Sequence, residues 1–272
     1  MNYTDILMYI RWDVDPTIFK GFSLGYYNLL FVGGIVLCAY IIKKMFDKEN
    51  IPESHYQTLF MYCLFGIVIG ARLGHCLFYE PEYYLRHPIE MFLPVSFEDG
   101  KIAFTGYRGL ASHGGTIGLL IALFLFSRKT KMNILKALDF IAIVAPLSAC
   151  FIRLGNLMNS EIIGKETDVP WAFIFTRVDF VPRHPAQLYE AIAYMFFFVL
   201  MIYLYKKRRE TLINGFLFGL VLTLIFSFRF FIEFFKERQV DFENNMFFNM
   251  GQLLSIPFVL AGLYFMFRKC KS

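Results

Sequence analysis

Seven long apolar stretches constrain this chain more than any other feature of its sequence. Most of them contain close to the roughly 20 residues that a helix needs to cross a bilayer. The expected spans are residues 22–42, 57–79, 113–127, 137–155, 186–205, 213–235 and 248–267. The third span is the weakest, because at about 1.5 Å per residue it reaches only about 22 Å. It either crosses the membrane or begins as a loop that dips into it.

The composition agrees with a membrane location. Of the 272 residues, 57% are hydrophobic and 18% are charged, and the mean hydropathy is +0.50. Soluble domains are about 45–50% apolar and about 25% charged. A soluble globule is therefore excluded, and so is a disordered chain. We expect an all-α membrane protein in which residues 1–272 form a single polytopic domain.

The segments between the spans fall into two sets that alternate along the chain. The first set comprises residues 43–56, 128–136, 206–212 and 268–272. The second comprises residues 1–21, 80–112, 156–185 and 236–247. The first set contains 14 Lys or Arg and 4 Asp or Glu, and the second contains 10 and 15.

Lys and Arg are enriched in cytoplasmic loops, so the first set is assigned to the cytoplasm. This assignment predicts seven transmembrane helices with the N-terminus outside (periplasmic) and the C-terminus cytoplasmic. Residues 80–112 and 156–185 would then form a small periplasmic head. The same bias explains the net charge of +5 without a nucleic-acid partner.

Three arginines and three acidic residues remain inside the spans. They are Arg72, Arg153, Arg229, Asp139, Glu190 and Glu233. A charge in lipid costs several kcal/mol, so each residue is a functional candidate that needs a partner. The predicted threading places all of them except Asp139 near the outer membrane surface.

Three guanidinium groups at this depth favour binding of a phospholipid phosphate. Guanidinium is permanently charged, and its planar fork matches a phosphate group. Three arginines beside two acids leave an excess of about one positive charge. The alternative is an ion-pair network that only joins helices, in which Arg229 and Glu233 pair at i, i+4.

The segment RLGNLMNSEIIG (153–164) surrounds one of these arginines with polar groups. Asn156, Asn159, Glu161 and Gly164 place amides, a carboxylate and flexible backbone beside Arg153. Amides at the interface can bind glycerol hydroxyls or ester carbonyls. The alternative is that Gly155 and Asn156 cap the helix.

His113, Gly114 and Gly115 mark the outer start of the third span. Histidine exchanges a proton near neutral pH, and glycines allow backbone amides to approach an anion. A hydrogen-bonded structural histidine is the alternative.

Other polar or small residues of the spans have structural explanations. The glycines Gly66, Gly70 and Gly74 form a small-residue stripe typical of close helix packing. Tyr26 and Tyr27 fit an interfacial aromatic belt. Gln187 and Glu190 differ, because they follow a proline at a helix start but add hydrogen-bonding groups at the same outer depth. No P-loop, HExxH, GxSxG or aspartate-rich metal motif is present, so no cofactor or metal is expected.

Four motifs follow one another along the chain. They are SHGGTIG (112–118), RLGNLMNSEIIG (153–164), RHPAQLYE (183–190) and RFFIEFF (229–235). Together they resemble the prolipoprotein diacylglyceryl transferase family of bacterial membrane enzymes. The resemblance covers nearly the whole chain. It implies a bacterial inner (cytoplasmic) membrane protein whose active site lies near the periplasmic leaflet.

The resemblance also implies a reaction. The family transfers the sn-1,2-diacylglyceryl group of phosphatidylglycerol to the lipobox cysteine thiol of a prolipoprotein signal peptide, and glycerol 1-phosphate leaves. The implied catalytic residues are His113, Arg229 and Tyr27. The implied phospholipid-binding residues are Arg153, Asn156, Glu161, Arg229, Glu233, Gly114 and Gly115. The implied supporting residues are Arg72, Asn159, Gly164, Gln187 and Glu190.

Two other classes of function compete with this interpretation. A transporter of an anionic amphiphile would use the same arginines, but it needs a polar route across the bilayer. The inner halves of the spans offer little beyond Asp139. A purely structural membrane subunit is the third hypothesis.

Overall fold

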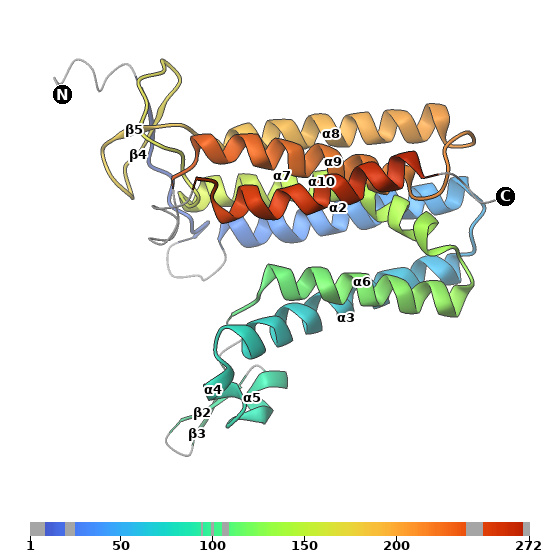
Figure 1. Ribbon diagram of the computed structural model, residues 1–272. Helices are drawn as coiled ribbons and strands as arrows, with labels where there is room; N and C mark the ends of the chain where they lie inside the picture. Colours follow the sequence, from blue (N-terminus) through green and yellow to red (C-terminus); the bar gives the residue numbers. More distant parts are fainter. Residues whose placement is uncertain are drawn as a thin grey trace. The chain divides into compact units, whose positions relative to one another are not determined.

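The computed structural model describes residues 9–19, 25–93, 95–98, 101–104, 109–237 and 247–268. Within these ranges the chain is mostly helical, and each apolar stretch of the sequence forms one long helix (Figure 1). These helices are α2 (Tyr26–Lys48), α3 (Glu53–Phe78), α6 (Ser112–Thr130), α7 (Ile134–Asn159), α8 (Ala186–Arg208), α9 (Phe216–Ile232) and α10 (Met250–Phe267).

Six helices in the described ranges are long and apolar enough to cross a membrane. They are α2, α3, α7, α8, α10 and α9, the last joined with the short 3-10 helix η1 (Glu233–Phe235). Helix α6 is not among them, and it is the span that the sequence predicts to be weakest. A mostly helical, multi-pass membrane protein is therefore confirmed, whereas seven crossings remain a prediction.

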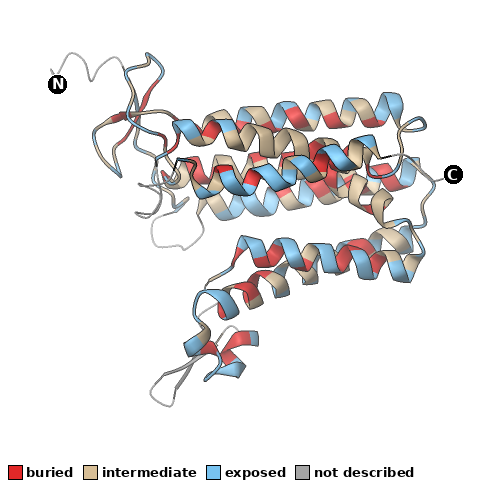
Figure 2. Cartoon of the chain, viewed as in Figure 1, coloured by how far each residue is buried: buried red, intermediate tan, exposed pale blue. Residues whose placement is uncertain are grey.

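The helices expose long apolar stripes, which suits a lipid environment. On α8, Ile192, Phe196, Val199 and Tyr203 are between 56% and 64% exposed. Their spacing of three or four residues places them on one helix face. Figure 2 shows similar exposed positions along other long helices. A soluble protein would rarely expose so much apolar surface, so we assign these faces to lipid.

The chain divides into two compact units. The larger unit contains Met1–Ile42 and Leu138–Ser272, and the smaller unit contains Lys43–Ala137. The expected outer segments 80–112 and 156–185 belong to different units, and parts of the first lie outside the described residues. A shared periplasmic head and a single domain remain predictions.

The smaller unit is built on close contact between α3 and α6. A Cβ atom added at Gly70 would lie 2.8 Å from the Cα of Gly118, which is closer than side chains normally approach. The glycine stripe is therefore a helix-packing surface, as the sequence predicts. The unit also contains the short helices α4 (Pro81–Tyr84) and α5 (Pro88–Phe92).

Short strands accompany the helices in both units, and the all-α expectation did not include them. Strands β2 (Val95–Glu98) and β3 (Lys101–Phe104) pair antiparallel in the smaller unit. In the larger unit, β4 (Phe173–Phe175) pairs parallel with β1 (Ile10–Trp12) and antiparallel with β5 (Pro182–Arg183).

The larger sheet is anchored to the C-terminal end of α7. The indole Nε1 of Trp12 donates a hydrogen bond to the carbonyl oxygen of Leu157 at 2.9 Å. Leu157, Phe173 and Phe175 form a buried apolar cluster against which Trp12 packs. This contact fixes the strands beside the polar residues that end α7.

Candidate functional site

Arg153 lies near the C-terminal end of α7, facing the buried Glu190 of α8. Its Nε atom is 3.2 Å from Glu190 Oε2, and its Nη1 donates to Asn156 Oδ1 at 3.1 Å. The Glu190 side chain is fully buried, and that of Arg153 is 14% exposed. A buried carboxylate needs a charge partner, and the arginine provides it. The guanidinium is thereby oriented by two neighbours.

A second carboxylate, that of Glu161, collects the amides of the same segment. Asn156 Nδ2 and Asn159 Nδ2 donate to Glu161 Oε1 at 2.8 and 3.2 Å. Gln187 Nε2, from α8, donates to the backbone carbonyl oxygen of Glu161 at 2.7 Å. Asn156 therefore connects Arg153 to Glu161 in one hydrogen-bonded chain.

The end of α7 differs from the capping alternative. The helix continues to Asn159, so Gly155 and Asn156 lie inside it and do not cap it. The turn that follows is strained, because Ser160 and Ile162 have φ angles of 55° and 56°. A β-branched residue rarely adopts this conformation. The contacts around Glu161 hold the turn in a shape that the isolated chain would avoid.

Gly155 instead makes room for Tyr27 of α2. A Cβ atom added at Gly155 would lie 2.7 Å from the Tyr27 ring. The Tyr27 hydroxyl is close enough to Glu161 and Arg153 to interact electrostatically with both. The structure thus brings Tyr27, Arg153 and Glu161 together, and their roles remain a prediction.

Arg229 approaches the same group of residues from α9. Both Arg229 and Arg153 interact electrostatically with the hydroxyl of Tyr194, which donates to Glu190 Oε1 at 3.3 Å. Among the described residues, no carboxylate lies within ion-pairing distance of Arg229. Guanidinium groups from two helices, α7 and α9, therefore both act electrostatically on the hydroxyl of Tyr194.

Among the described residues, Glu233 has partners other than Arg229, so the ion-pair alternative at i, i+4 is not what the structure shows. Glu233 Oε1 is 3.2 Å from Lys236 Nζ, and Glu233 Oε2 accepts from Asn249 Nδ2 at 3.0 Å. The Glu233 carboxylate is therefore occupied by Lys236 and Asn249, which follow it in the sequence.

Lys236 is the main residue of this cluster that the sequence analysis missed. Its side chain is only 5% exposed, and its Nζ atom also lies 3.1 Å from Glu190 Oε1. Its position just after a span placed it in an outer loop. The spacing of three residues from Glu233 was the available signal, but sequence alone does not reveal the burial.

Gly164 lies where two chain segments approach from opposite sides. Its backbone pairs with that of Lys236, and its N–H donates to the carbonyl oxygen of His184 at 3.0 Å. A Cβ atom there would lie 2.9 Å from the carbonyl oxygen of Phe235 and closer still to His184. Only glycine fits between these segments.

Charged groups reinforce this junction. Arg183 pairs with Asp179 at 2.7 Å and with Glu237, and it donates to the carbonyl oxygen of Gly164 at 3.3 Å. The hydrogen bonds from Arg183 lower the pKa of Asp179 below its usual value. Burial lowers the pKa of His184, so its imidazole is neutral at pH 7.

Arg72 has its partners within the smaller unit. Its Nε and Nη2 donate to the backbone carbonyl oxygens of Met91 and Glu90 at 3.1 and 2.6 Å. The guanidinium lies 4.7 Å from the centre of the Tyr84 ring. These contacts fasten α4 and α5 to α3, which is a structural use of an intramembrane arginine.

The His113-Gly114-Gly115 element also belongs to the smaller unit. The His113 side chain is exposed at the start of α6. A Cβ atom at Gly114 would lie 2.8 Å from the Cα of Gly74, so this glycine serves helix packing. The Gly115 N–H donates to the carbonyl oxygen of Ala111 at 3.0 Å. The expectation that the Gly115 amide is open to an anion is therefore wrong.

Asp139, the acid expected near the inner end of α7, caps the N-terminus of α9. Its Oδ2 accepts from the Gly215 N–H at 2.6 Å, and its Oδ1 accepts from the Phe218 N–H at 2.8 Å. These are N–H groups at the start of α9, which have no partners within that helix. The residue thus has a structural function.

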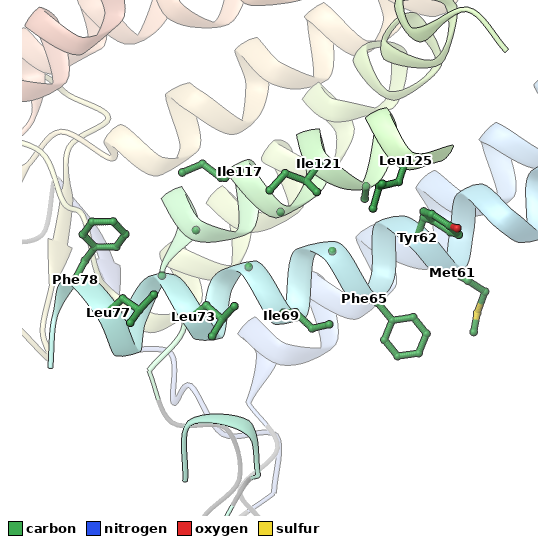
Figure 3. Close-up of a pocket in the computed structure, with 16 residues that line it drawn as sticks. Met61, Tyr62, Phe65, Ile69, Leu73, Leu77, Phe78, Ile117, Ile121 and Leu125 are labelled. Atoms are coloured by element: carbon green, nitrogen blue, oxygen red, sulfur yellow. The ribbon is translucent and has the colours of Figure 1, made fainter. Parts of the chain in front are cut away.

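A groove of about 710 Å³ runs along the α3–α6 pair (Figure 3). Glycines of both helices line it, together with large apolar side chains such as Phe65, Leu73 and Ile121. It contains no charged side chain. The groove is therefore suited to apolar groups, and the polar chemistry lies with Arg153 and Arg229.

The fold and the site together define a multi-pass membrane protein with ionised side chains clustered at one end of its helices. The family model for prolipoprotein diacylglyceryl transferase matches residues 16–268. The chain therefore belongs to the prolipoprotein diacylglyceryl transferase family.

Relatives with the same kind of name cover almost the whole chain. The phosphatidylglycerol–prolipoprotein diacylglyceryl transferase of Bacteroides fragilis is 59% identical over 266 residues, covering 97% of this chain and 96% of its own. The enzyme of that name from Chloroherpeton thalassium is 44% identical over 271 residues, covering 98% and 97%. The resemblance inferred from the four motifs is confirmed.

Proposed function

We propose that this protein transfers the sn-1,2-diacylglyceryl group of phosphatidylglycerol to the thiol of a prolipoprotein lipobox cysteine. A carbon–sulfur bond forms at the glycerol carbon, the bond from that carbon to the phosphate oxygen breaks, and glycerol 1-phosphate leaves. Family membership supports the reaction. The observation that carries the assignment of the site is that Arg153 of α7 and Arg229 of α9 both act electrostatically on the hydroxyl of Tyr194.

Arg153 and Arg229 bind the phosphate of the lipid headgroup in this proposal. Negative charge grows on the phosphate as it leaves, and fixed guanidiniums stabilise charge where it develops. Tyr27, Asn156 and Glu161 contact the glycerol headgroup, which agrees with their connection to Arg153 by hydrogen bonds and charge. Glu233 contributes indirectly, through Lys236 and Asn249.

His113 accepts the thiol proton in this proposal. A free thiol has a pKa near 8.5 and is mostly protonated at neutral pH, so a base accelerates its attack. The exposed side chain of His113 supports the assignment.

The proposed topology has seven crossings, with α6 as one of them, in a bacterial cytoplasmic membrane. The N-terminus lies on the periplasmic side and the C-terminus in the cytoplasm. Lys- and Arg-rich segments alternate with acidic ones along the chain, which supports this orientation. The site would then face the periplasmic leaflet.

The test is to supply the purified protein with phosphatidylglycerol and a lipobox peptide and to weigh the peptide by mass spectrometry. We expect a diacylglyceryl adduct from the wild type. Arg153→Lys should lose about 10²-fold in rate, because an ammonium group cannot form the bidentate contact. The matched control is Arg128→Lys, which changes an exposed arginine.

Each part of the proposed function has its own result that would contradict it. No adduct from the wild type, under conditions in which a Bacteroides fragilis relative is active, would reject the proposed reaction. Lipid translocation in proteoliposomes without adduct would favour a transporter. A normal rate for Arg153→Lys would remove Arg153 as phosphate ligand, and a normal rate for His113→Gln would remove His113 as base.

A further inference from the structure

Lys236 and Arg153 share one fully buried carboxylate. Glu190 has its Oε1 atom 3.1 Å from Lys236 Nζ and its Oε2 atom 3.2 Å from Arg153 Nε. The Lys236 side chain, at 5% exposed, is itself shielded from solvent. The two carboxylate oxygens of Glu190 therefore each face a different cation, Lys236 at Oε1 and Arg153 at Oε2.

The backbone fixes the lysine in this position. Lys236 pairs with Gly164 in an antiparallel bridge, and the Lys165 N–H donates to the carbonyl oxygen of Phe235 at 2.8 Å. Glu233 Oε1 holds the ammonium from another side at 3.2 Å. The buried lysine is therefore built into the junction that follows Glu161.

The charge count of the cluster depends on this lysine. The cations are Arg153, Arg229 and Lys236, and the carboxylates are Glu161, Glu190 and Glu233. The cluster is neutral with Lys236 and would carry one negative charge without it. Within this set of residues the expected positive excess is absent, because Glu161 adds a negative charge and Arg72, whose guanidinium donates to backbone carbonyls of Glu90 and Met91, is not part of the set. A phosphate approaching the cluster would be repelled if the lysine were removed.

We propose that Lys236 is a positioning residue for phospholipid binding. It neutralises Glu190, and so it prevents that carboxylate from drawing the Arg153 guanidinium into a bidentate pair. The N–H donors of Arg153 then remain available for the lipid phosphate. The proposal rests on the proposed function of Arg153 as phosphate ligand.

The test compares Lys236→Met with Lys236→Arg in steady-state kinetics on phosphatidylglycerol. Lys236→Met should raise KM for phosphatidylglycerol and lower kcat/KM by about 10²-fold, because displacing the Arg153 guanidinium from the phosphate costs roughly that much. Lys236→Arg keeps the charge and should stay within about tenfold of the wild type. Lys43→Met, which breaks an exposed pair with Glu53, is the matched control and should change nothing.

The double variant Lys236→Met/Glu190→Gln separates charge balance from folding. It restores neutrality, so KM should return toward the wild-type value. A purely structural lysine would instead lower the yield of folded enzyme and leave KM unchanged. That result, or unchanged kinetics in Lys236→Met, would overturn the inference. An inactive wild type would reject the proposed function and is a separate outcome.

Discussion

Buried carboxylates hold the cations of this site in place through individual ion pairs. Glu190 holds Arg153 and Lys236, and Glu233 holds Lys236 and Asn249. A carboxylate buried without such partners would be strongly destabilising. The cations are consequently ordered before any ligand arrives, which lowers the cost of binding a phosphate.

Gly164 provides a prediction at this scale. Gly164→Ala should lower the stability by about 1–3 kcal/mol, because its Cβ atom would overlap the backbone of His184 and Phe235. Activity should fall too, since the displaced segment carries Lys236. Thermal unfolding in detergent and the peptide assay would measure both.

The control for Gly164→Ala is Gly33→Ala. No atom lies within 4 Å of a Cβ at Gly33, so this alanine should be tolerated. Equal melting temperatures for the two variants would show that the close approach at Gly164 is unimportant.

The residues of the site were partly predictable from the sequence. Arg153, Asn156 and Glu161 lie within nine consecutive residues, so their proximity follows from local spacing. Lys236 was not predictable, because its burial depends on a strand-like pairing with a segment some 70 residues away. Arg72 was assigned to the phosphate because the sequence cannot show its carbonyl partners.

At the scale of elements, helix contacts and not ligand contacts explain most of the glycines. Gly70, Gly74, Gly114 and Gly118 let α3 and α6 approach through their backbones. The spacing of Gly66, Gly70 and Gly74 predicted this contact, whereas nothing local distinguished Gly114 from Gly115. The short strands were also not predicted, since two to four residues carry too little pattern.

Neighbouring glycines of α6 should respond differently to alanine. Gly114→Ala should destabilise the protein, because its Cβ atom would clash with the α3 backbone. Gly115→Ala should be nearly neutral, because its nearest contact, Ala71 Cβ at 3.5 Å, is ordinary. Thermal unfolding of both variants is the measurement. Equal destabilisation would contradict the assignment of Gly114 to helix packing.

For the whole molecule, the long apolar stretches of the sequence predicted the helices best. All seven apolar stretches became helices, because lipid leaves the backbone no hydrogen-bond partners other than its own. Hydropathy supports six of them as spans among the described residues. Helix α6 is not one of the six, although its 19 residues are more than the 18 of α10, so its short predicted length is not the reason. Asp139 is committed to capping α9, so it no longer supports a polar route to the inner surface.

The most direct test of the account is a structure of the protein in a lipid nanodisc with phosphatidylglycerol bound. We predict phosphate oxygens within about 3 Å of guanidinium nitrogens of both Arg153 and Arg229. A phosphate that contacts neither arginine, or only one of them, would contradict the central claim that arginines of two helices bind one lipid headgroup together.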